Sequence, residues 1–368
     1  MAERLQRHVH CLLGLPFDEV DMAGAVSRVR DAAGRRERCF LSTPNLNWLA
    51  ACLNDPAFRG SVMRSDLSIP DGTPLIWIAK LLGIPLRERV AGSTLFEILR
   101  RENPRKISVF FFGGPDGAAE AACQRLNHEG RGLAGAGYES PGFGSVEDMS
   151  TGAIVGRINA SQADFLVVAL GARKGQAWIE RNLERLNVPV VSHLGAVVNF
   201  VAGTARRAPV WTQQAGLEWL WRIKEEPDLW RRYFLDGMVL LRLLVTRVLP
   251  HAWLISRHAP GPRELASAIF ECRDTEGEIS IQLRGAWVRQ NLQPLTECVS
   301  TAAMSRKNVR FDLKNASYVD SAFLGLLMLA SAELAPHGRR LTIADPPPNV
   351  RRIFRYACAE FLLDSPRA

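Results

Sequence analysis

Two polar clusters directly follow short apolar runs early in the chain, and their residue types could carry out chemistry. The first, with Thr43, Asn45 and Asn47, comes after a predicted strand that ends at Leu41, and the second is centred on Asp71. A helical pattern follows each cluster. Ligands of α/β sheets bind where the carboxyl ends of strands meet helix N-termini, so we expect these four side chains to line one crevice. Helix caps and turns use the same residue types, and this ordinary interpretation stays open.

Three further strand ends carry glycine, basic or amide residues of the kind that holds a diphosphate. The apolar runs 107–112, 164–170 and 188–192 each lead into a turn and then a helical pattern. Backbone N–H groups at a helix N-terminus and arginine side chains bind phosphate oxygens. The candidate residues in these turns are Gly113, Gly114, Arg173, Gln176 and Gly195. The first turn has neither dinucleotide-binding nor Walker spacing, and plain tight turns or exposed basic loops would look the same.

The elements that must position these residues alternate between strand and helix over residues 1–203. The run 12–15 predicts a first strand and 17–33 a first helix, whereas the glycine-rich run 135–144 predicts a loop. Short buried strands separated by helices are typical of a mostly parallel, Rossmann-like sheet, so we predict an α/β fold. With 368 residues, 47% of them hydrophobic and 23% charged, the chain has an ordinary globular composition and room for two domains.

Residues 204–256 differ in composition from the sheet region and are predicted to form a helical tail. Four of the nine tryptophans lie within 203–237, at positions 211, 219, 221 and 230, among several arginines. Composition alone does not choose among single-stranded nucleic acid, a lipid interface and ordinary helix packing as its partner. The most hydrophobic run, 238–255, is interrupted by Arg242, Arg247 and Pro250. It therefore predicts a buried or an interfacial helix rather than a membrane-spanning one.

A proline- and glycine-rich break at 257–264 is the best candidate for a linker between domains. After it, residues 265–368 alternate again between short apolar strands and helical patterns. About 100 residues of this kind can form a separate small α/β domain.

Charge and cysteine usage indicate the compartment and the class of partner. The chain has 46 Lys and Arg against 38 Asp and Glu, a net charge of +8, which favours phosphate-bearing substrates, nucleic acid or an acidic membrane surface. Its seven scattered cysteines form no C-x-x-C pair, which indicates reduced thiols in the cytoplasm and no zinc site. The N-terminus shows no signal-peptide pattern. Three histidines lack partners at ligand spacing, so we expect structural roles and no metal for His10, His193 and His251.

Residues from about 12 to 233 resemble the WecG/TagA/CpsF family, glycosyltransferase family 26. The motifs that carry the resemblance are LLGLPFD, STPNLNWL, IPDGTPLIW, ERVAGSTLF, FFGG, DFLVVALGARKGQAWI and RRAPVWTQQAGLEWLWRIKEEPDLWRRY. The last motif is long and rich in tryptophan and arginine, and it stands in the right place after the final strand.

The resemblance implies a bacterial enzyme that transfers a sugar from a UDP-sugar to a polyprenyl-diphosphate-linked saccharide, with inversion and without a metal or other cofactor. The products feed exopolysaccharide and other cell-surface polysaccharides. Asp71 would be the general base, Thr43 and Asn45 would help to form the crevice, and Arg89 would bind phosphate. The segment 206–233 would cover the site and touch an anionic membrane surface, which implies a cytoplasmic protein on the inner face of the membrane. The family also allows a homo-oligomer.

An inverting transfer needs a base for the acceptor hydroxyl and positive groups for the departing diphosphate. Asp71 can supply the base, and Arg89, Arg206 and Arg207 can supply the positive charge.

Two departures from the family pattern concern the donor site. In the run 171–176, Gln176 is displaced by one position and Arg173 replaces a proline, and Asn199 stands before Phe200 where many members have Asp. N-acetylmannosamine and a hexose such as glucose therefore both stay open as the transferred sugar.

The C-terminal part resembles a STAS domain, the module of anti-sigma-factor antagonists. The motifs are VRFDLKNASYVDSAFLGLLML and RRLTIADPPPNVRRIF. Ala322 occupies the usual phosphoacceptor position, so we expect no phosphorylation switch, a helix-capping role for Ser321 and a domain that docks a protein partner. Two alternatives to the transferase stay open: a catalytically diverged scaffold of polysaccharide assembly, and a nucleic-acid-binding regulator suggested by the basic, tryptophan-rich tail. We expect no nucleic acid among the partners.

Overall fold

A six-stranded parallel sheet forms the centre of the N-terminal region. The computed structural model describes residues 2–101, 105–209, 211–212 and 216–363, so parts of the predicted tail (210 and 213–215) and the predicted last domain (364–368) lie outside it. The strand order is β4-β3-β8-β7-β5-β6, and every neighbouring pair is parallel. The strands are β3 (Cys39–Ser42), β4 (Leu67–Ser68), β5 (Ile107–Gly113), β6 (Leu133–Glu139), β7 (Phe165–Ala169) and β8 (Val190–His193). This confirms the predicted α/β class with a mostly parallel sheet.

Helices cover both faces of this sheet because alternate strand residues are apolar on both sides. Leu41, Val109 and Phe111 pack against one layer of helices, while Phe40 and Phe110 pack against the other. The first layer consists of α2 (Met22–Arg35), α6 (Gly92–Arg101), α7 (Ala118–Glu129) and α10 (Gly195–Ala202). The second contains α8 (Gly152–Ala160) and α9 (Ala172–Asn182).

Two local predictions were wrong. The run 12–15 contains the turn of an antiparallel hairpin, β1 (Val9–Leu12) and β2 (Leu15–Asp18), because Leu13 and Gly14 adopt φ angles of 50° and 82°. The predicted loop 135–144 overlaps β6, which pairs with the apolar strand β5 despite its own glycines. Its side chains are only partly buried, so the strand carries little of the apolar signal on which the prediction relied.

A third group of helices lies between the sheet and the hairpin and forms its own apolar cluster. It consists of α3 (Leu46–Cys52), α4 (Pro56–Met63) and α5 (Thr73–Leu81). α3 follows β3 and α5 follows β4, so their N-termini stand at the carboxyl edge of the sheet. A short helix, α1 (Ala2–Leu5), precedes the hairpin.

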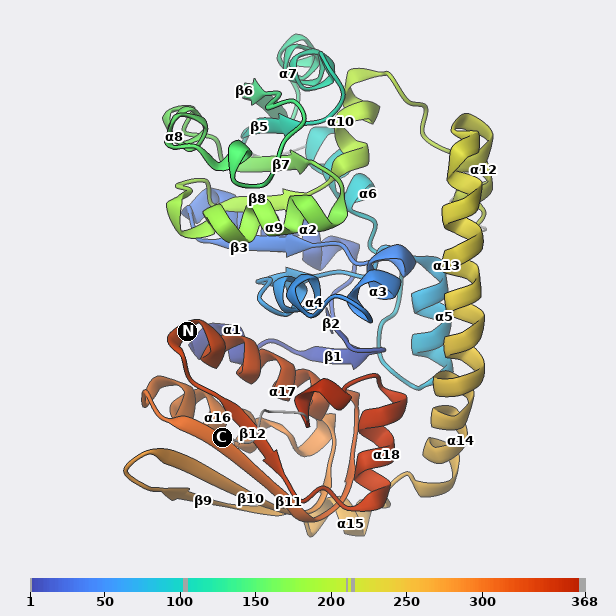
Figure 1. Ribbon diagram of the computed structural model, residues 1–368, viewed down its shortest axis with the longest axis vertical. Coiled ribbons are helices and arrows are strands. Elements are labelled where there is room, and N and C mark those ends of the chain that lie inside the picture. The colour runs from blue at the N-terminus through green and yellow to red at the C-terminus, as the bar shows by residue number, and fades with distance from the viewer. Residues whose placement is uncertain (1, 102–104, 210, 213–215, 364–368) are drawn as a thin grey trace.

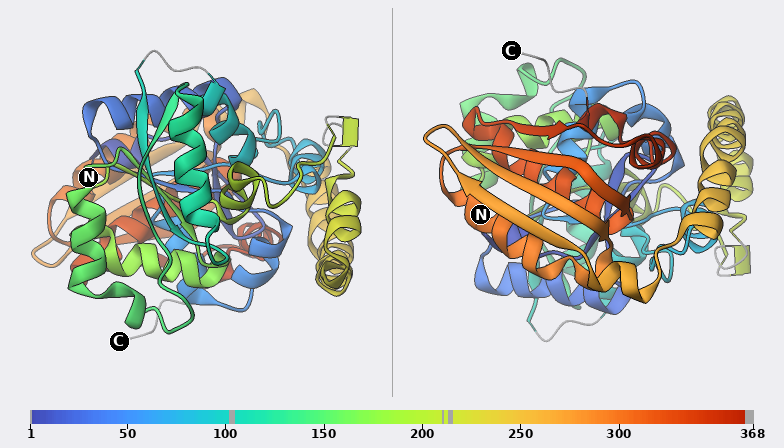
Figure 2. Two further views of the ribbon diagram at one scale, coloured as in Figure 1. Left: turned by 90° about the horizontal axis from the view of Figure 1, so that it is seen from above. Right: turned by 90° about the horizontal axis from the view of Figure 1, so that it is seen from below.

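The tail is helical, as predicted, and runs along one side of the whole molecule (Figures 1 and 2). It comprises α12 (Glu218–Glu225) and a long helix of 32 residues, Pro227–His258. Within the long helix, α13 (Trp230–Leu243) and α14 (Leu249–His258) are joined by a π-helical turn, Leu244–Val248. A π-turn leaves room for Pro250, which cannot donate a backbone hydrogen bond, so the helix continues through it.

The C-terminal region is a second α/β unit with a mixed four-stranded sheet in the order β12-β11-β10-β9. β10 is parallel to β11 and antiparallel to β9. The strands are β9 (Ile269–Asp274), β10 (Glu278–Trp287), β11 (Asn308–Val319) and β12 (Leu341–Ala344). The helices are α15 (Pro262–Ala266), α16 (Gln293–Met304), α17 (Ser321–Leu334) and α18 (Pro348–Tyr356). In Figure 1 this unit lies below the hairpin, and α14 passes along its side.

Candidate active site

The two polar clusters predicted from the sequence lie side by side at the carboxyl edge of the sheet. Asn45 caps α3, and its side-chain oxygen accepts a hydrogen bond from the backbone N–H of Trp48 at 3.2 Å. Asp71 lies in the loop between β4 and α5, and its backbone N–H donates to the carbonyl of Pro44 at 3.0 Å. This backbone hydrogen bond directly links the two loops that follow β3 and β4. Asn45 is a helix cap, as the ordinary interpretation predicts, and it also lines a cavity at this edge of the sheet.

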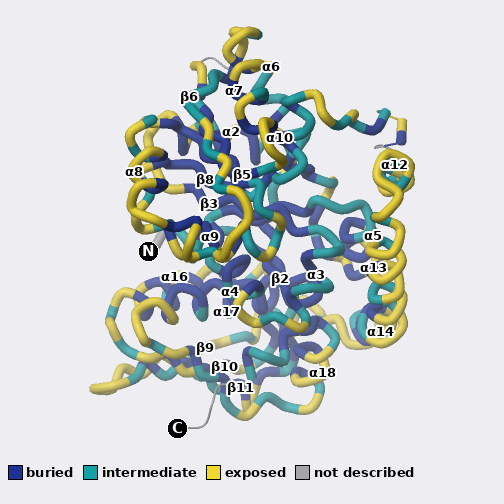
Figure 3. Tube along the Cα trace, turned by 45° about the horizontal axis from the view of Figure 1, so that its top comes forward, coloured by how far each residue is buried: buried dark blue, intermediate teal, exposed yellow. Residues whose placement is uncertain are grey.

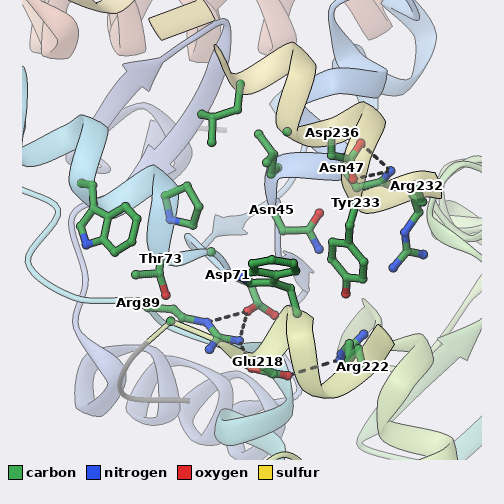
Figure 4. Close-up of a pocket in the computed structure, with 18 of the residues that line it drawn as sticks. Asn45, Asn47, Asp71, Thr73, Arg89, Glu218, Arg222, Arg232, Tyr233 and Asp236 are labelled. Atoms are coloured by element: carbon green, nitrogen blue, oxygen red, sulfur yellow. Dashed lines mark hydrogen bonds and ion pairs between the residues drawn. The ribbon is translucent and has the colours of Figure 1, made fainter. Parts of the chain in front are cut away.

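A cavity of about 440 Å³ opens between this sheet edge and the tail (Figure 4). Its floor comes from the N-termini of α3 and α5, and its outer wall comes from α12 and α13. The polar and charged side chains that line it are Asn45, Asn47, Asp71, Thr73, Arg89, Ser93, Glu218, Arg222, Arg232, Tyr233 and Asp236. The apolar side chains that line it include Leu46, Trp77, Trp219 and Leu240.

A chain of ion pairs crosses the cavity from the sheet to the tail. The Arg89 guanidinium donates to Asp71 Oδ1 from Nε (3.2 Å) and Nη2 (3.0 Å), and Nη2 also donates to Glu218 Oε2 at 2.8 Å. Glu218 in turn pairs with Arg222 at 3.5 Å. The other Asp71 oxygen accepts from the backbone N–H of Gly92 at 3.3 Å. These bonds fix the Asp71 carboxylate in one orientation at the floor of the cavity.

Charge and burial compete at two of these groups. Burial opposes the charge on Glu218, but Arg89 and Arg222 outweigh it and hold the pKa of this carboxyl below its usual value. Burial likewise disfavours the charged form of Arg89, but Asp71 and Glu218 raise its pKa above the ordinary value. Glu218 is therefore an anion bound to Arg89, in the place where a substrate anion would compete for the same guanidinium.

A second carboxylate faces the cavity from the tail. Asp236 is 7% exposed, and both of its oxygens lie 3.3 Å from the Asn47 side-chain nitrogen. Burial raises the pKa of Asp236, although the Asn47 hydrogen bond and the Arg232 charge partly oppose this. Tyr233 projects into the space between this pair and Asp71 (Figure 4). The Asn47–Asp236 contact fastens α13 to α3.

The structure brings four of the predicted residues together in the cavity, namely Asn45, Asn47, Asp71 and Arg89. Thr43 lies just behind them and is buried, and a Cβ on Gly92 would come within 2.9 Å of its methyl group. Two predicted arginines border the region. Arg207 donates to Thr94 Oγ1 at 3.0 Å, and Arg206 lines a separate cavity of about 40 Å³ beside Asn199 and Trp221. Burial lowers the pKa of Arg207.

The other predicted residues do not line this cavity. Gln176 is completely buried. Its side-chain nitrogen donates to Ser42 Oγ at 2.7 Å, and its side-chain oxygen accepts from Ser61 Oγ at 3.1 Å. Arg173 is exposed at the start of α9, with its nearest carboxylate oxygen on Asp55 at 3.9 Å. The glycines mark other strand ends: Gly113 is the last residue of β5, Gly114 follows it, and Gly195 begins α10 after β8.

Sequence reasoning did not assign Thr73 and Ser93, nor any of the polar lining residues that come from the tail. The tail residues are Glu218, Arg222, Arg232, Tyr233 and Asp236. They fall within or next to the quoted motif that ends in WRRY, but nothing in the spacing shows which of them faces the sheet. Over the described part of the chain, no group of three or more His, Cys, Asp or Glu side chains could hold a metal ion. Of the predicted histidines, His10 and His251 are buried and His193 is partly buried; burial of its ring lowers the pKa of His193 to about 4.

The site thus combines an α/β sheet, one oriented carboxylate beyond a strand end and arginine side chains in a cavity that the tail covers. Residues 10–252 match the family described as glycosyl transferase WecG/TagA/CpsF, and the chain belongs to this family of glycosyltransferases. Residues 271–363 match the family described as Mlab, STAS domain.

Several relatives carry the name N-acetylglucosaminyldiphosphoundecaprenol N-acetyl-beta-D-mannosaminyltransferase. The protein from Bacillus spizizenii strain W23 is 28% identical over 239 residues, which cover 64% of this chain and 89% of the relative. The protein from Bacillus subtilis strain 168 is 26% identical over 193 residues, 52% of this chain and 73% of the relative. Among solved structures, the unphosphorylated anti-sigma factor antagonist SpoIIAA is 21% identical and matches 26% of this chain and 85% of its own, with a TM-score of 0.25.

Proposed function

We propose that this protein transfers a sugar from a UDP-sugar to a polyprenyl-diphosphate-linked saccharide in the synthesis of a bacterial cell-surface polysaccharide. The observation that carries the proposal is the Asp71 carboxylate, oriented by Arg89 and Gly92 at the floor of a cavity that arginines line. The names of the relatives support a polyprenyl-diphosphate-linked acceptor. N-acetylmannosamine and a hexose such as glucose are both candidates for the sugar.

In this proposal, Asp71 is the general base of a single displacement with inversion. It removes the proton from the acceptor hydroxyl while that oxygen attacks the anomeric carbon of the donor sugar. The bond between that carbon and the diphosphate oxygen breaks, and UDP leaves with the electron pair. The negative charge that develops on the diphosphate is stabilised by guanidinium groups, of which Arg89, Arg222 and Arg232 line the cavity.

The tail supports the proposal that the protein works at the surface of a membrane. Pro227–His258 is long and apolar enough to cross a membrane by length and composition, and only 22% of its most apolar stretch is buried. Its exposed apolar residues recur every three or four positions, and Figure 3 shows that α13 and α14 are largely exposed. The residues on this stripe are Trp230, Phe234, Met238, Leu241, Val245, Leu249 and Trp253. We name it the tail stripe. We propose that it lies in the inner face of the membrane.

Trp77 and Leu81 of α5 are also exposed, at 60% and 51%, and Trp77 lines the cavity. The part of the cavity beside Trp77 would then lead toward the lipid, from which a polyprenyl-linked acceptor could enter.

The test is release of UDP from a panel of UDP-sugars with polyprenyl-diphosphate-GlcNAc or -glucose as acceptor, in detergent and without added metal. We expect turnover with one donor and a loss of about 10²–10⁴-fold in Asp71→Asn, the range of a general base. Asp228→Asn is the matched control, because Asp228 is exposed on the tail and does not line the cavity. Turnover that survives in Asp71→Asn would refute the role of this carboxylate.

A further inference from the structure

The C-terminal domain is packed against the transferase along an extensive contact, of which the first part is the N-terminal hairpin. α17 crosses β1 so closely that a Cβ on Gly325 would lie 2.1 Å from the carbonyl oxygen of Val9. Leu5, Val9 and Cys11 belong to the same apolar cluster as the core of the C-terminal domain. Only glycine permits this approach, so the surface of α17 is shaped to fit the backbone of the transferase.

Polar contacts fix the N-terminal end of α17 on the same hairpin. His10 Nδ1 lies 3.0 Å from Ser321 Oγ, and Arg289 Nη2 donates to Glu19 Oε1 at 2.8 Å. Asp320 caps α17 and also accepts from the backbone N–H of Arg289 at 2.9 Å. The predicted capping role of Ser321 was therefore wrong: Asp320 caps α17 by accepting from the backbone N–H groups of Ala322 and Phe323. The Ser321 hydroxyl instead lies in the contact between the two domains.

The second part of the contact holds the end of the tail helix. Arg247 Nη1 donates to the carbonyl of Arg355 at 2.5 Å and pairs with Glu360 at 3.3 Å. The rings of His251 and Tyr356 lie 6.2 Å apart, and Leu254 is buried in the cluster of the C-terminal domain. α18 thus lies against the π-turn and α14.

The transferase core also contacts the C-terminal end of this domain. The Arg59 guanidinium of α4 stacks over the Phe361 ring at 3.7 Å, and Cys358 packs into the apolar cluster formed by α3, α4 and α5. The C-terminal domain therefore contacts both the transferase core and the tail helix.

The long helix Pro227–His258 contacts α18 near its C-terminal end, and its N-terminal half forms a wall of the cavity. Asp236 and Leu240 line the cavity, and Leu254 lies 18 residues beyond Asp236, about 27 Å along a helix. Between these points the helix exposes the tail stripe. Near the cavity it is fastened by the Asn47–Asp236 contact.

We infer that the STAS domain is an internal partner of the transferase: its α17 and α18 dock on the hairpin and the tail helix, and this docking holds α13 in the position that closes the cavity. The face of α17 that bears Ser321 and Gly325 is occupied within the chain. The expected docking role is thereby assigned to a partner in the same polypeptide, with the STAS domain acting as a positioning element for the active site.

The test compares Gly325→Leu with Gly277→Leu in the full-length protein. The atoms nearest to a Cβ at Gly325 belong to β1, whereas a Cβ at Gly277 meets nothing within 4 Å. In Gly325→Leu we expect amide exchange to rise at least tenfold in 9–12, in 249–258 and in the cavity wall 233–240. Transfer is expected to fall at least tenfold, while Gly277→Leu behaves as wild type. Faster exchange in 9–12 with unchanged exchange in 233–240 would overturn the inference.

A charge reversal provides an independent variant should Gly325→Leu fail to fold. Arg247→Glu places a carboxylate opposite Glu360, and Glu360→Arg in the same chain restores an opposite-charge pair. We expect several-fold faster exchange in 233–240 and in 249–258 for the single variant and recovery in the double variant. Absence of recovery, or no change in the single variant, would overturn the inference. Amide exchange needs no substrate, so a wild-type protein without turnover would refute the proposed function and leave this test intact.

Discussion

Arg89 forms ion pairs both with the sheet edge, through Asp71, and with the tail, through Glu218. Its guanidinium contacts both Asp71 and Glu218, and the three side chains are each about one-fifth exposed. In the proposed function a donor diphosphate binds the same guanidinium, so Glu218 would compete with it. Because Glu218 is held as an anion, it lowers the positive potential that a diphosphate would meet.

Glu218→Gln is therefore expected to bind UDP more tightly. Removing one negative charge beside Arg89 is worth about 1 kcal/mol at an intermediate dielectric, or about fivefold in the Kd for UDP at low salt, and the gain should shrink as salt is added. Isothermal titration at two ionic strengths measures it. Glu225→Gln, an exposed position on the same helix, is the control. Weaker binding in Glu218→Gln would instead mean that Glu218 holds Arg89 in place for the ligand.

The tail helix exposes a stripe of large apolar side chains, which we propose to lie in a membrane. Leu241 and Val245 are 54% and 58% exposed at the middle of the tail stripe. Changing both to Glu removes two apolar groups from the proposed interface, which should weaken binding to anionic vesicles by at least about tenfold. Co-sedimentation measures this, with Met304→Glu as the control because Met304 is a similarly exposed apolar residue of α16.

The stripe prediction has a clear contrary result. Unchanged vesicle binding in Leu241→Glu/Val245→Glu would show that another surface contacts the lipid. Since neither residue lines the cavity, binding of soluble UDP should stay the same in this variant.

Elements with strong local signals were predictable from the sequence, and those defined by long-range contacts were not. β5 and β7 are continuous apolar runs, so their place in a parallel sheet was predicted. Asp71 was proposed because it follows the short strand β4 and lies in one of the motifs of the family resemblance. β6 was missed because its glycines gain their strand conformation only by pairing with β5. Glu218 and Asp236 were not assigned because they reach the site across 129 and 189 residues of chain.

At the scale of the whole molecule, the partly buried His193 and the buried His251 are expected to make the fold sensitive to acid. Burial lowers the pKa of both His193 and His251 to about 4, and in each ring one nitrogen is buried without a hydrogen-bond partner. His193 lies beneath α3, where its ring is 5.8 Å from that of Trp48, and His251 lies between the tail helix and α18. Protonation would place an unpaired charge in each of these packed regions.

The direction of the pH effect follows from the lowered pKa. An unfolded histidine takes up a proton near pH 6.5, whereas the folded one resists until about pH 4, so the unfolded state binds more protons between these values. Stability contributed by each neutral histidine is fully present above pH 6.5 and is lost as the pH falls toward 4. A full shift of this size corresponds to about 3 kcal/mol of unfolding free energy per histidine.

Replacing His251 should therefore flatten the acid side of the stability profile. We expect His251→Phe to lose less unfolding free energy than wild type between pH 6.5 and 4.5 in urea titrations, because one proton-linked penalty is removed. His337→Phe, at an exposed position, should leave the profile unchanged. Because His251 contacts Tyr356 of α18, acid should also loosen the hold of the STAS domain on α14 before the central sheet unfolds. Amide exchange that rises in 249–258 no earlier than in β5 and β7 would contradict this order.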